Sequence, residues 1–386
     1  MRANRSVSFR MVAAALSLML AVFTVLSADV IVRVWLLRGR MESAVDAAVL
    51  LSYEAARTLT TALALGLAIA SWRRASDATR RLFTLLVLFL GFWYTKAFAF
   101  AAFPGPLQER LAGWLFDTGV PRSVTTFIFG APVWAAWLAL GALLRLSALF
   151  PAPLDAAAID RSGGNDRTGL LRGVHLAGLD VGAAFRRIST ALVRVGAFGA
   201  APVWLVVIAG GTLHALAVGP AARVLLGTLW VALLMVAVTN LRATMAEAPE
   251  SGKRRVLWML QAAIVALAAY ATAAVLSIAG GRLESGVSFG FAAFAPPVIL
   301  MGLALAIRRR HPPNPRHAIR RTLTLGIAAV AAAVAYVLSA GLVSGRTPPP
   351  VTTLIAVAVA TMCTLLLRSG IRRVVGRIEA GVATPS

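Results

Sequence analysis

The sequence predicts an all-α membrane protein, a polytopic bundle of about ten transmembrane helices with both termini in the cytoplasm. Of its 386 residues, 59% are hydrophobic and 14% are charged, whereas soluble domains carry about 25% charged residues. The mean hydropathy is +0.81. A soluble fold of this size leaves about a quarter of its unfolded surface in water, so a soluble globular enzyme is excluded. A disordered chain is excluded as well, because such chains are poor in apolar residues.

The apolar residues fall in runs of the length that a bilayer requires. A helix needs about 20 apolar residues to cross the hydrocarbon core. The segments that meet this requirement are residues 11–32, 52–71, 82–103, 123–147, 195–218, 221–241, 256–279, 287–307, 322–343 and 350–367. Glu54 and Arg57 dilute the second segment and the tenth is short, so these two are the weakest candidates.

The basic residues predict the orientation. Lys and Arg number 38 against 15 Asp and Glu, a net charge of +23. With the N-terminus inside, 28 basic residues lie in inner segments or at their span ends and 8 lie in outer segments or at their span ends, while Arg57 and Lys96 fall deeper within spans. This asymmetry is typical of a bacterial cytoplasmic (inner) membrane protein with both termini inside. It explains the positive charge without nucleic acid, and it adds anionic lipids at the cytoplasmic face as partners of the protein.

The first apolar segment has two interpretations. Arg2, Arg5 and Arg10 precede an apolar stretch that contains Leu26-Ser27-Ala28, an arrangement that fits a cleavable signal peptide. The stretch continues to Trp35, which is long for a signal peptide. We therefore expect an uncleaved first helix, and the cleaved form remains the alternative.

Polar segments divide the chain into four parts. Residues 1–150 hold four spans, residues 151–194 form a cytoplasmic connector, residues 195–367 hold six spans, and residues 368–386 are a basic tail. The prolines of Phe150-Pro151-Ala152-Pro153 end the fourth span, because proline cannot continue a helix.

The connector and the tail both predict amphipathic helices. In the connector, Leu170, Leu171, Val174, Phe185, Ile188 and Leu192 alternate with Arg172, Arg186, Arg187 and Arg194. Such a helix lies in the headgroup plane with its arginines toward anionic lipid; the alternative is an ordinary connector packed on the bundle. The candidate residues for anionic lipid along the whole chain are Arg186, Arg187, Arg308, Arg309, Arg310, Arg372 and Arg373.

The tail continues the last span with apolar residues at heptad spacing, Leu367, Ile371, Val374 and Ile378. This spacing predicts a signalling helix or a dimer contact. A collar of snorkelling arginines at the membrane exit is the alternative.

Ionisable residues within spans are candidate functional groups, because an unpaired charge in a bilayer costs several kcal/mol. Asp29, Glu54, Arg57 and Lys96 all fall in the outer half of the membrane, and their charges cancel. Beside Lys96 come two aromatic residues, Trp93 and Tyr94, which predict an outward-facing polar pocket with aromatic walls. The alternative is a structural ion-pair cluster that joins the first three spans.

Two further polar groups lie in the second set of spans. His214, near the outer end of the fifth span, is either a pH switch or an interfacial hydrogen-bonding group. Asn240 and Gln261 are predicted to form hydrogen bonds between helices.

The sequence shows no phosphate-cradling GxxxxGK[ST] motif and no paired carboxylates at active-site spacing on one helix. Its single cysteine, Cys363, lies in an apolar run, and its four histidines have no metal-ligand spacing. We therefore predict neither a metal site nor a cofactor.

Several stretches resemble the multi-helix membrane input modules that precede bacterial sensor histidine kinases and PP2C-type phosphatases. They are Leu143-Leu144-Arg145-Leu146-Ser147-Ala148-Leu149-Phe150-Pro151, Asn240-Leu241-Arg242 with Lys253-Arg254-Arg255-Val256-Leu257-Trp258, Ile319-Arg320-Arg321-Thr322-Leu323-Thr324-Leu325-Gly326, and Leu367 to Arg377. The resemblance covers roughly residues 130–380 in patches. It implies a sensing or scaffolding module. It does not imply the output activity, because no kinase or phosphatase domain follows in this sequence.

The leading functional hypothesis is thus a non-catalytic membrane module for signal input or complex assembly, with another protein subunit or a second copy of the chain as partner. A transporter or channel for a small solute is the alternative, supported by the number of spans, by Pro296-Pro297 within the eighth span and by the outer charged groups. An intramembrane lipid-modifying enzyme is a third hypothesis, for which the sequence shows no converging catalytic groups.

Overall fold

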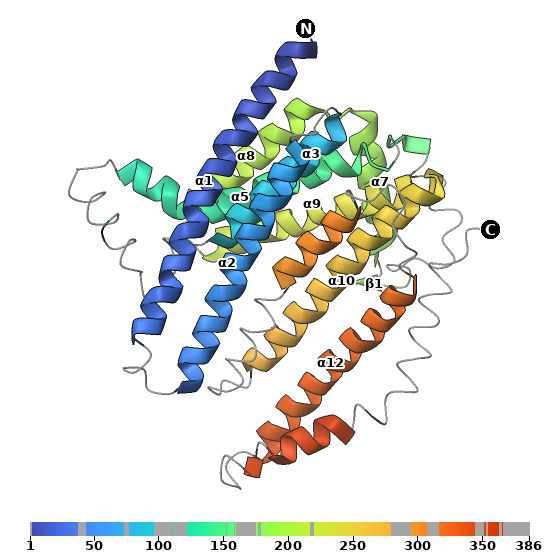
Figure 1. The fold of residues 1–386 in the computed structure, drawn as a ribbon. Coiled ribbons are helices and arrows are strands. Elements are labelled where there is room, and N and C mark those ends of the chain that lie inside the picture. The colour runs from blue at the N-terminus through green and yellow to red at the C-terminus, as the bar shows by residue number, and fades with distance from the viewer. Residues whose placement is uncertain are drawn as a thin grey trace. The chain divides into compact units, whose positions relative to one another are not determined.

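The fold was analysed in a computed structural model of the chain (Figure 1). The structure describes residues 2–37, 44–72, 77–95, 110, 122–151, 153–157, 159, 175–176, 179–216, 220–278, 295–306, 316–343, 351–352, 354–362 and 365.

The described part of the chain is helical apart from one short pair of strands, which confirms the predicted helical class. The helices are α1 (Arg2–Leu37), α2 (Ala44–Trp72), α3 (Ala78–Thr95), α5 (Arg122–Ser147), α7 (Val181–Arg194), α8 (Ala200–Leu216), α9 (Pro220–Glu247), α10 (Glu250–Ile278) and α12 (Arg316–Val343). The strands β1 (His175–Leu176) and β2 (Leu179–Asp180) pair antiparallel.

Three helical segments are long and apolar enough to cross a membrane, namely Ser8–Leu36, Leu51–Trp72 and Val224–Met245. They coincide with the first, second and sixth predicted spans. The second was a weak candidate in the sequence because of Glu54 and Arg57, yet α2 continues through both residues as an unbroken helix. By their length and composition, these three helices indicate a membrane protein.

The side chains on several helices are apolar and exposed, as expected of surfaces that contact lipid. Exposed large hydrophobic residues include Met11, Leu18, Leu36, Val224, Leu225, Val231, Leu325, Leu338 and Leu342. A water-soluble monomer rarely exposes contiguous apolar surface on this scale. Hydrocarbon, by contrast, solvates such side chains well, and the backbone groups of a continuous helix are already hydrogen-bonded to one another.

The chain divides into two compact units. One consists of Met1–Gly39, Arg57–Asp166 and Leu171–Lys253, and the other of Arg40–Ala56, Arg167–Leu170 and Arg254–Ser386.

In the first unit, α5 is the central helix and packs against α3, α8 and α9. Trp137 of α5 is fully buried in the core together with Leu140, Val207 and Val236. Gly210 of α8 lies against the Trp137 ring so closely that an added Cβ would come within 2.7 Å of its Cη2 atom. The small residue therefore sets the distance between α5 and α8, as is common between helices in membranes.

A second close approach joins the first three helices. A Cβ added at Gly91 of α3 would lie 2.8 Å from Leu20 of α1 and 2.9 Å from Ala64 of α2. Phe23 and Phe92 pack edge to face nearby, with ring centroids 5.9 Å apart. The C-terminal part of α2 is thereby held with α1 and α3 in the first unit.

In the second unit, the short apolar helix Ala295–Ala306 packs on α10. A Cβ added at Gly302 would overlap Ala262 and lie 3.1 Å from the carbonyl oxygen of Trp258. Pro296 and Pro297 occupy the first turn of this helix. Proline is well tolerated there, because the first backbone N–H groups have no partner within the helix. Within residues 295–306 the two prolines therefore cause no break in the helix.

Candidate functional site

The amphipathic helix α7 lies inside the segment where the sequence predicts one. It begins at Val181, directly after β2, in which Asp180 pairs with His175 and Leu179 with Leu176. The residues in β2 and at the start of α7 are contiguous, so the strand pair fixes where the helix begins.

One side of α7 packs on the first unit. Phe185, Leu192 and Val193 contact the buried core around Trp137. Spacings of seven and eight residues place all three on one face of a helix. Ile188 was predicted to belong to this apolar face, but its side chain is 47% exposed and lies at the edge of the packed surface.

A buried polar junction also holds α7 to the bundle. Ser189 of α7 donates a hydrogen bond to Asn240 Oδ1 of α9. Asn240 Nδ2 in turn donates to Ser147 Oγ at the end of α5, at 3.4 Å. All three residues are 0% exposed. Because burying such groups without partners costs about 1–3 kcal/mol each, the junction fixes both the position and the rotation of α7.

Neighbouring hydrogen bonds secure the end of α5. Thr244 Oγ1 donates to the carbonyl oxygen of Phe150 at 3.3 Å. Arg145 Nη1 donates to the carbonyl oxygen of Phe198, in the turn between α7 and α8. The last turn of α5 is therefore tied to α9 and to the segment that follows α7.

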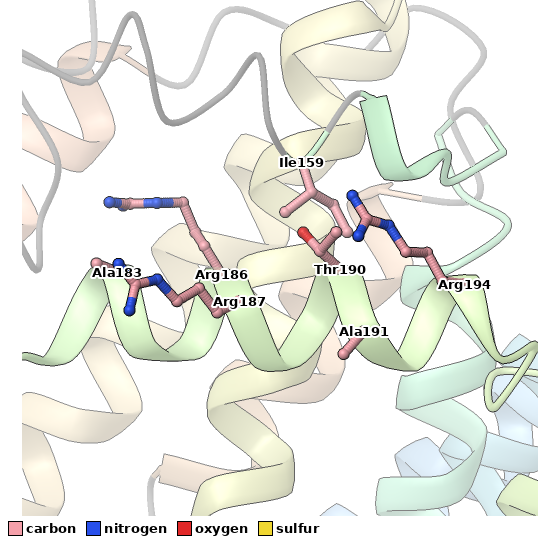
Figure 2. A pocket seen from close by; sticks show the side chains of 7 residues that line it. All are labelled: Ile159, Ala183, Arg186, Arg187, Thr190, Ala191 and Arg194. Carbon is pink, nitrogen blue, oxygen red and sulfur yellow. The ribbon is translucent and has the colours of Figure 1, made fainter.

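The opposite side of α7 lines a cavity of about 460 Å³ (Figure 2). Its lining residues are Ile159, Ala183, Arg186, Arg187, Thr190, Ala191 and Arg194. Six of these lie on α7 in two adjacent rows, with residues four apart within each row, and so form one stripe on its surface. Ile159 lies across from Thr190 and beside the Arg194 side chain, and it is fully buried.

The cavity has a strongly basic lining. Three of its seven residues are arginines, and none is acidic. The nearest described carboxylate along the chain before Ile159 is that of Asp155, which accepts a hydrogen bond from the backbone N–H of Ala157 at 2.9 Å. The arrangement suits an anion, since guanidinium groups bind phosphate and carboxylate oxygens through paired N–H donors.

The outer residues predicted as a polar pocket are only partly brought together. Arg57 is 6% exposed, and its Nε donates to the carbonyl oxygen of Tyr94 at 3.3 Å. Trp93 stacks on Tyr94 with ring centroids 5.2 Å apart and packs against Trp230 of α9 at 5.8 Å. Arg57 and the two predicted aromatic residues therefore lie at one place, at the end of α3.

The other outer candidates are placed as follows. Glu54 is 3% exposed and precedes Arg57 by one turn of α2, and Asp29 is partly buried in α1. Lys96 lies outside the described residues. Among the described residues, no group of three His, Cys, Asp or Glu could hold a metal ion.

His214 is half-buried and contacts the core through Trp137. Its Nδ1 accepts a hydrogen bond from Trp137 Nε1 at 3.2 Å, and the two rings meet edge to face. The hydrogen bond satisfies the indole N–H of a fully buried tryptophan.

Of the predicted anionic-lipid residues, the structure brings Arg186 and Arg187 together at the cavity. The remaining ones, Arg308, Arg309, Arg310, Arg372 and Arg373, lie outside the described residues. Sequence reasoning missed Thr190, Ile159 and the contribution of Arg194 to the same cavity. A helical stripe drawn through Arg187 would have included Arg194, seven residues later, whereas nothing in the sequence pointed to Ile159.

Comparison of the chain with protein-family models gives no match, and comparisons with curated proteins and with solved structures give none either.

Proposed function

We propose that the protein is a non-catalytic integral membrane module that receives a signal or assembles a larger complex in the bacterial cytoplasmic membrane. In this proposal it crosses the bilayer ten times, with both termini and the segment 151–194 in the cytoplasm. The distribution of basic residues along the sequence supports that orientation. The patchy resemblance to the input modules of sensor kinases and phosphatases supports the functional class.

The observation that carries the proposal is the attachment of α7. One side of this helix is joined to α9 and α5 through Ser189, Asn240 and Ser147. The other side presents arginines around a cavity. A helix held this way connects the surface of the membrane to two helices of the bundle, which is what a module that senses or assembles requires.

Co-purification tests the proposal. The full chain, tagged and extracted from its native membranes in a mild detergent, is expected to retain a second protein subunit or a second copy of itself. A Leu192→Asp variant, which should release α7 by burying a charge in its packed face, is expected to lose that partner. Recovery of the unmodified chain as a lone monomer would contradict the proposal.

Transport of a small solute is the second candidate function. It is favoured by the buried Arg57 side chain, which lies with two aromatic residues at the end of α3. If this place belongs to a pathway, proteoliposomes containing the protein should take up a charged solute, and Arg57→Gln or Lys96→Ala should abolish the uptake. Liposomes that remain impermeable to a panel of small anions and cations would exclude this candidate.

A further inference from the structure

The cavity on α7 combines positive charge with an apolar border. Arg186, Arg187 and Arg194 surround it, and Thr190 adds a hydroxyl group. Ile188 and Val195, which are 47% and 77% exposed, lie three residues before and four residues after the lining residue Ala191. Ile188 neighbours Ala191 on the surface of α7, because residues three apart lie side by side, and Val195 follows the last residue of α7 with its backbone N–H bonded to the carbonyl oxygen of Ala191. A ligand that fits both features is an amphiphile with an anionic head.

We propose that this cavity binds the phosphate headgroup of an anionic phospholipid. Its volume of about 460 Å³ falls in the range of pockets that enclose small organic ligands, roughly 300–1,000 Å³. The arginines would hold the phosphate oxygens, and the acyl chains would leave the cavity over Ile188 and Val195. This inference rests on the proposed membrane location, in which α7 lies at the cytoplasmic surface.

The arginines are spaced for a headgroup that extends along the helix. Arg187 and Arg194 are seven residues apart, which is about 10.5 Å along a helix axis, and Arg186 lies beside the first of them. A headgroup with two phosphates can contact both ends of this stripe. We therefore expect cardiolipin, a phospholipid with two phosphates, to bind more tightly than phosphatidylglycerol, which has one.

The shape of the site is set by contacts on the other side of α7. The hydrogen bond from Ser189 to Asn240 and the packing of Phe185 and Leu192 fix the rotation of the helix. The side of α7 that carries Arg186, Arg187 and Arg194 is thereby held in one orientation rather than free to turn in the plane of the headgroups. A preformed site of this kind selects among lipids, whereas an unattached basic helix binds any anionic surface by charge alone.

Lipid titration of the purified full chain in detergent tests the proposal, with bound lipid counted by native mass spectrometry. Cardiolipin and phosphatidylglycerol are expected to bind and phosphatidylcholine is not. Each arginine near an anionic headgroup contributes about 1 kcal/mol. Replacing Arg186, Arg187 and Arg194 by Gln together should therefore weaken binding on the order of 100-fold, and each single replacement about fivefold.

Two further variants distinguish binding in the cavity from general electrostatic attraction between the lipid and basic residues. Arg10→Gln, Arg80→Gln and Arg254→Gln combined remove the same charge on the same predicted side, and binding should stay within about twofold of the unmodified chain. Ala183→Leu keeps every charge but fills part of the cavity, and it should weaken cardiolipin binding. If the two triple variants lose binding equally, or if Ala183→Leu binds normally, the site is not the cavity and the proposal fails.

A soluble phosphate compound could bind the same arginines as the phosphate of a lipid headgroup does. Inorganic phosphate and glycerol phosphate, titrated as competitors, are expected to displace cardiolipin weakly because they lack the acyl chains. Displacement at concentrations comparable to the lipid would assign the cavity to a soluble anion and overturn the proposal. The lipid titration and the co-purification can fail separately. A chain that recovers no protein partner but still selects cardiolipin through these arginines contradicts only the proposed module function.

Discussion

At the scale of single residues, small side chains decide how closely the helices of the first unit approach one another. Gly210 and Gly227 provide a matched pair, because the first lies against the Trp137 ring and the second has no atom within 4 Å of an added Cβ. The same substitution should therefore have opposite effects at the two positions.

Gly210→Ala is expected to destabilise the protein by about 1–3 kcal/mol, since the added methyl group must displace a buried ring. Gly227→Ala should be neutral or stabilising by up to about 1 kcal/mol, because alanine favours a helix over glycine. Thermal unfolding in detergent measures both. Equal effects of the two substitutions would mean that α5 and α8 are not in close contact at this point.

Asn240 is the second residue whose substitution is informative. Asn240→Ala removes the acceptor of Ser189 and the donor to Ser147, and it should cost about 1–3 kcal/mol with faster amide hydrogen exchange in α7. Thr228→Ala on the same helix is the control, because this exposed hydroxyl bonds only its own helix, at the carbonyl oxygen of Val224. Unchanged exchange in α7 after Asn240→Ala would argue against the junction.

At the scale of elements, α9 has two contrasting surfaces. Val236 and Ala237 are buried in the core, whereas Val224, Leu225 and Val231 are exposed. If α9 crosses the membrane as proposed, these exposed residues face lipid, and the cost of a charge should depend on its depth.

Val231→Arg places a charge near the middle of the span Val224–Met245 and should cost about 2.5–3.5 kcal/mol of insertion free energy. Ala222→Arg, near the start of α9, should cost little because its side chain can reach the headgroups. Insertion of α9 into microsomes, scored by glycosylation of flanking acceptor sites, measures the difference. Equal insertion of both variants would show that the exposed face of α9 does not contact lipid.

The contacts of α7 show which part of an element a sequence can predict. The spacing of Phe185 and Leu192 and the arginines between them predict an amphipathic helix, because these signals lie within one stretch of chain. The junction could not be predicted in the same way, since Ser189 and Asn240 are 51 residues apart and Asn240 and Ser147 are 93 apart. Asn240 alone indicated a hydrogen bond between helices, but only the packing of three helices identifies its partners.

At the scale of the whole molecule, composition predicted the helical membrane class, because apolar runs of fixed length are a property of the chain itself. The outer polar residues were harder to interpret. Arg57 and Tyr94 are brought together by the pairing of α2 with α3, and His214 bonds Trp137, 77 residues away. Such pairings depend on which helices are neighbours, which hydropathy does not encode.

The proposed orientation of the chain in the membrane leads to a direct prediction. Reporter fusions that are active only in the cytoplasm should be active after residue 165 and after Ile378, and inactive after residue 40. The 28 inner basic residues provide the physical reason, since positively charged loops resist translocation. A fusion after Ile378 that is active only in the periplasm would show that the chain crosses the bilayer an odd number of times.

The hydrogen bond between Ser189 and Asn240 has a mechanical consequence. The 14 residues of α7 form one continuous helix, so any turn about its axis is shared by all of them. Ser189 and Arg187 point about 200° apart, and a turn that swings the arginine toward denser negative charge swings the serine away from the asparagine. Surface potential would then act as a torque on α7, and its effect on α9 would be the loss of the hydrogen bond from Ser189 to Asn240.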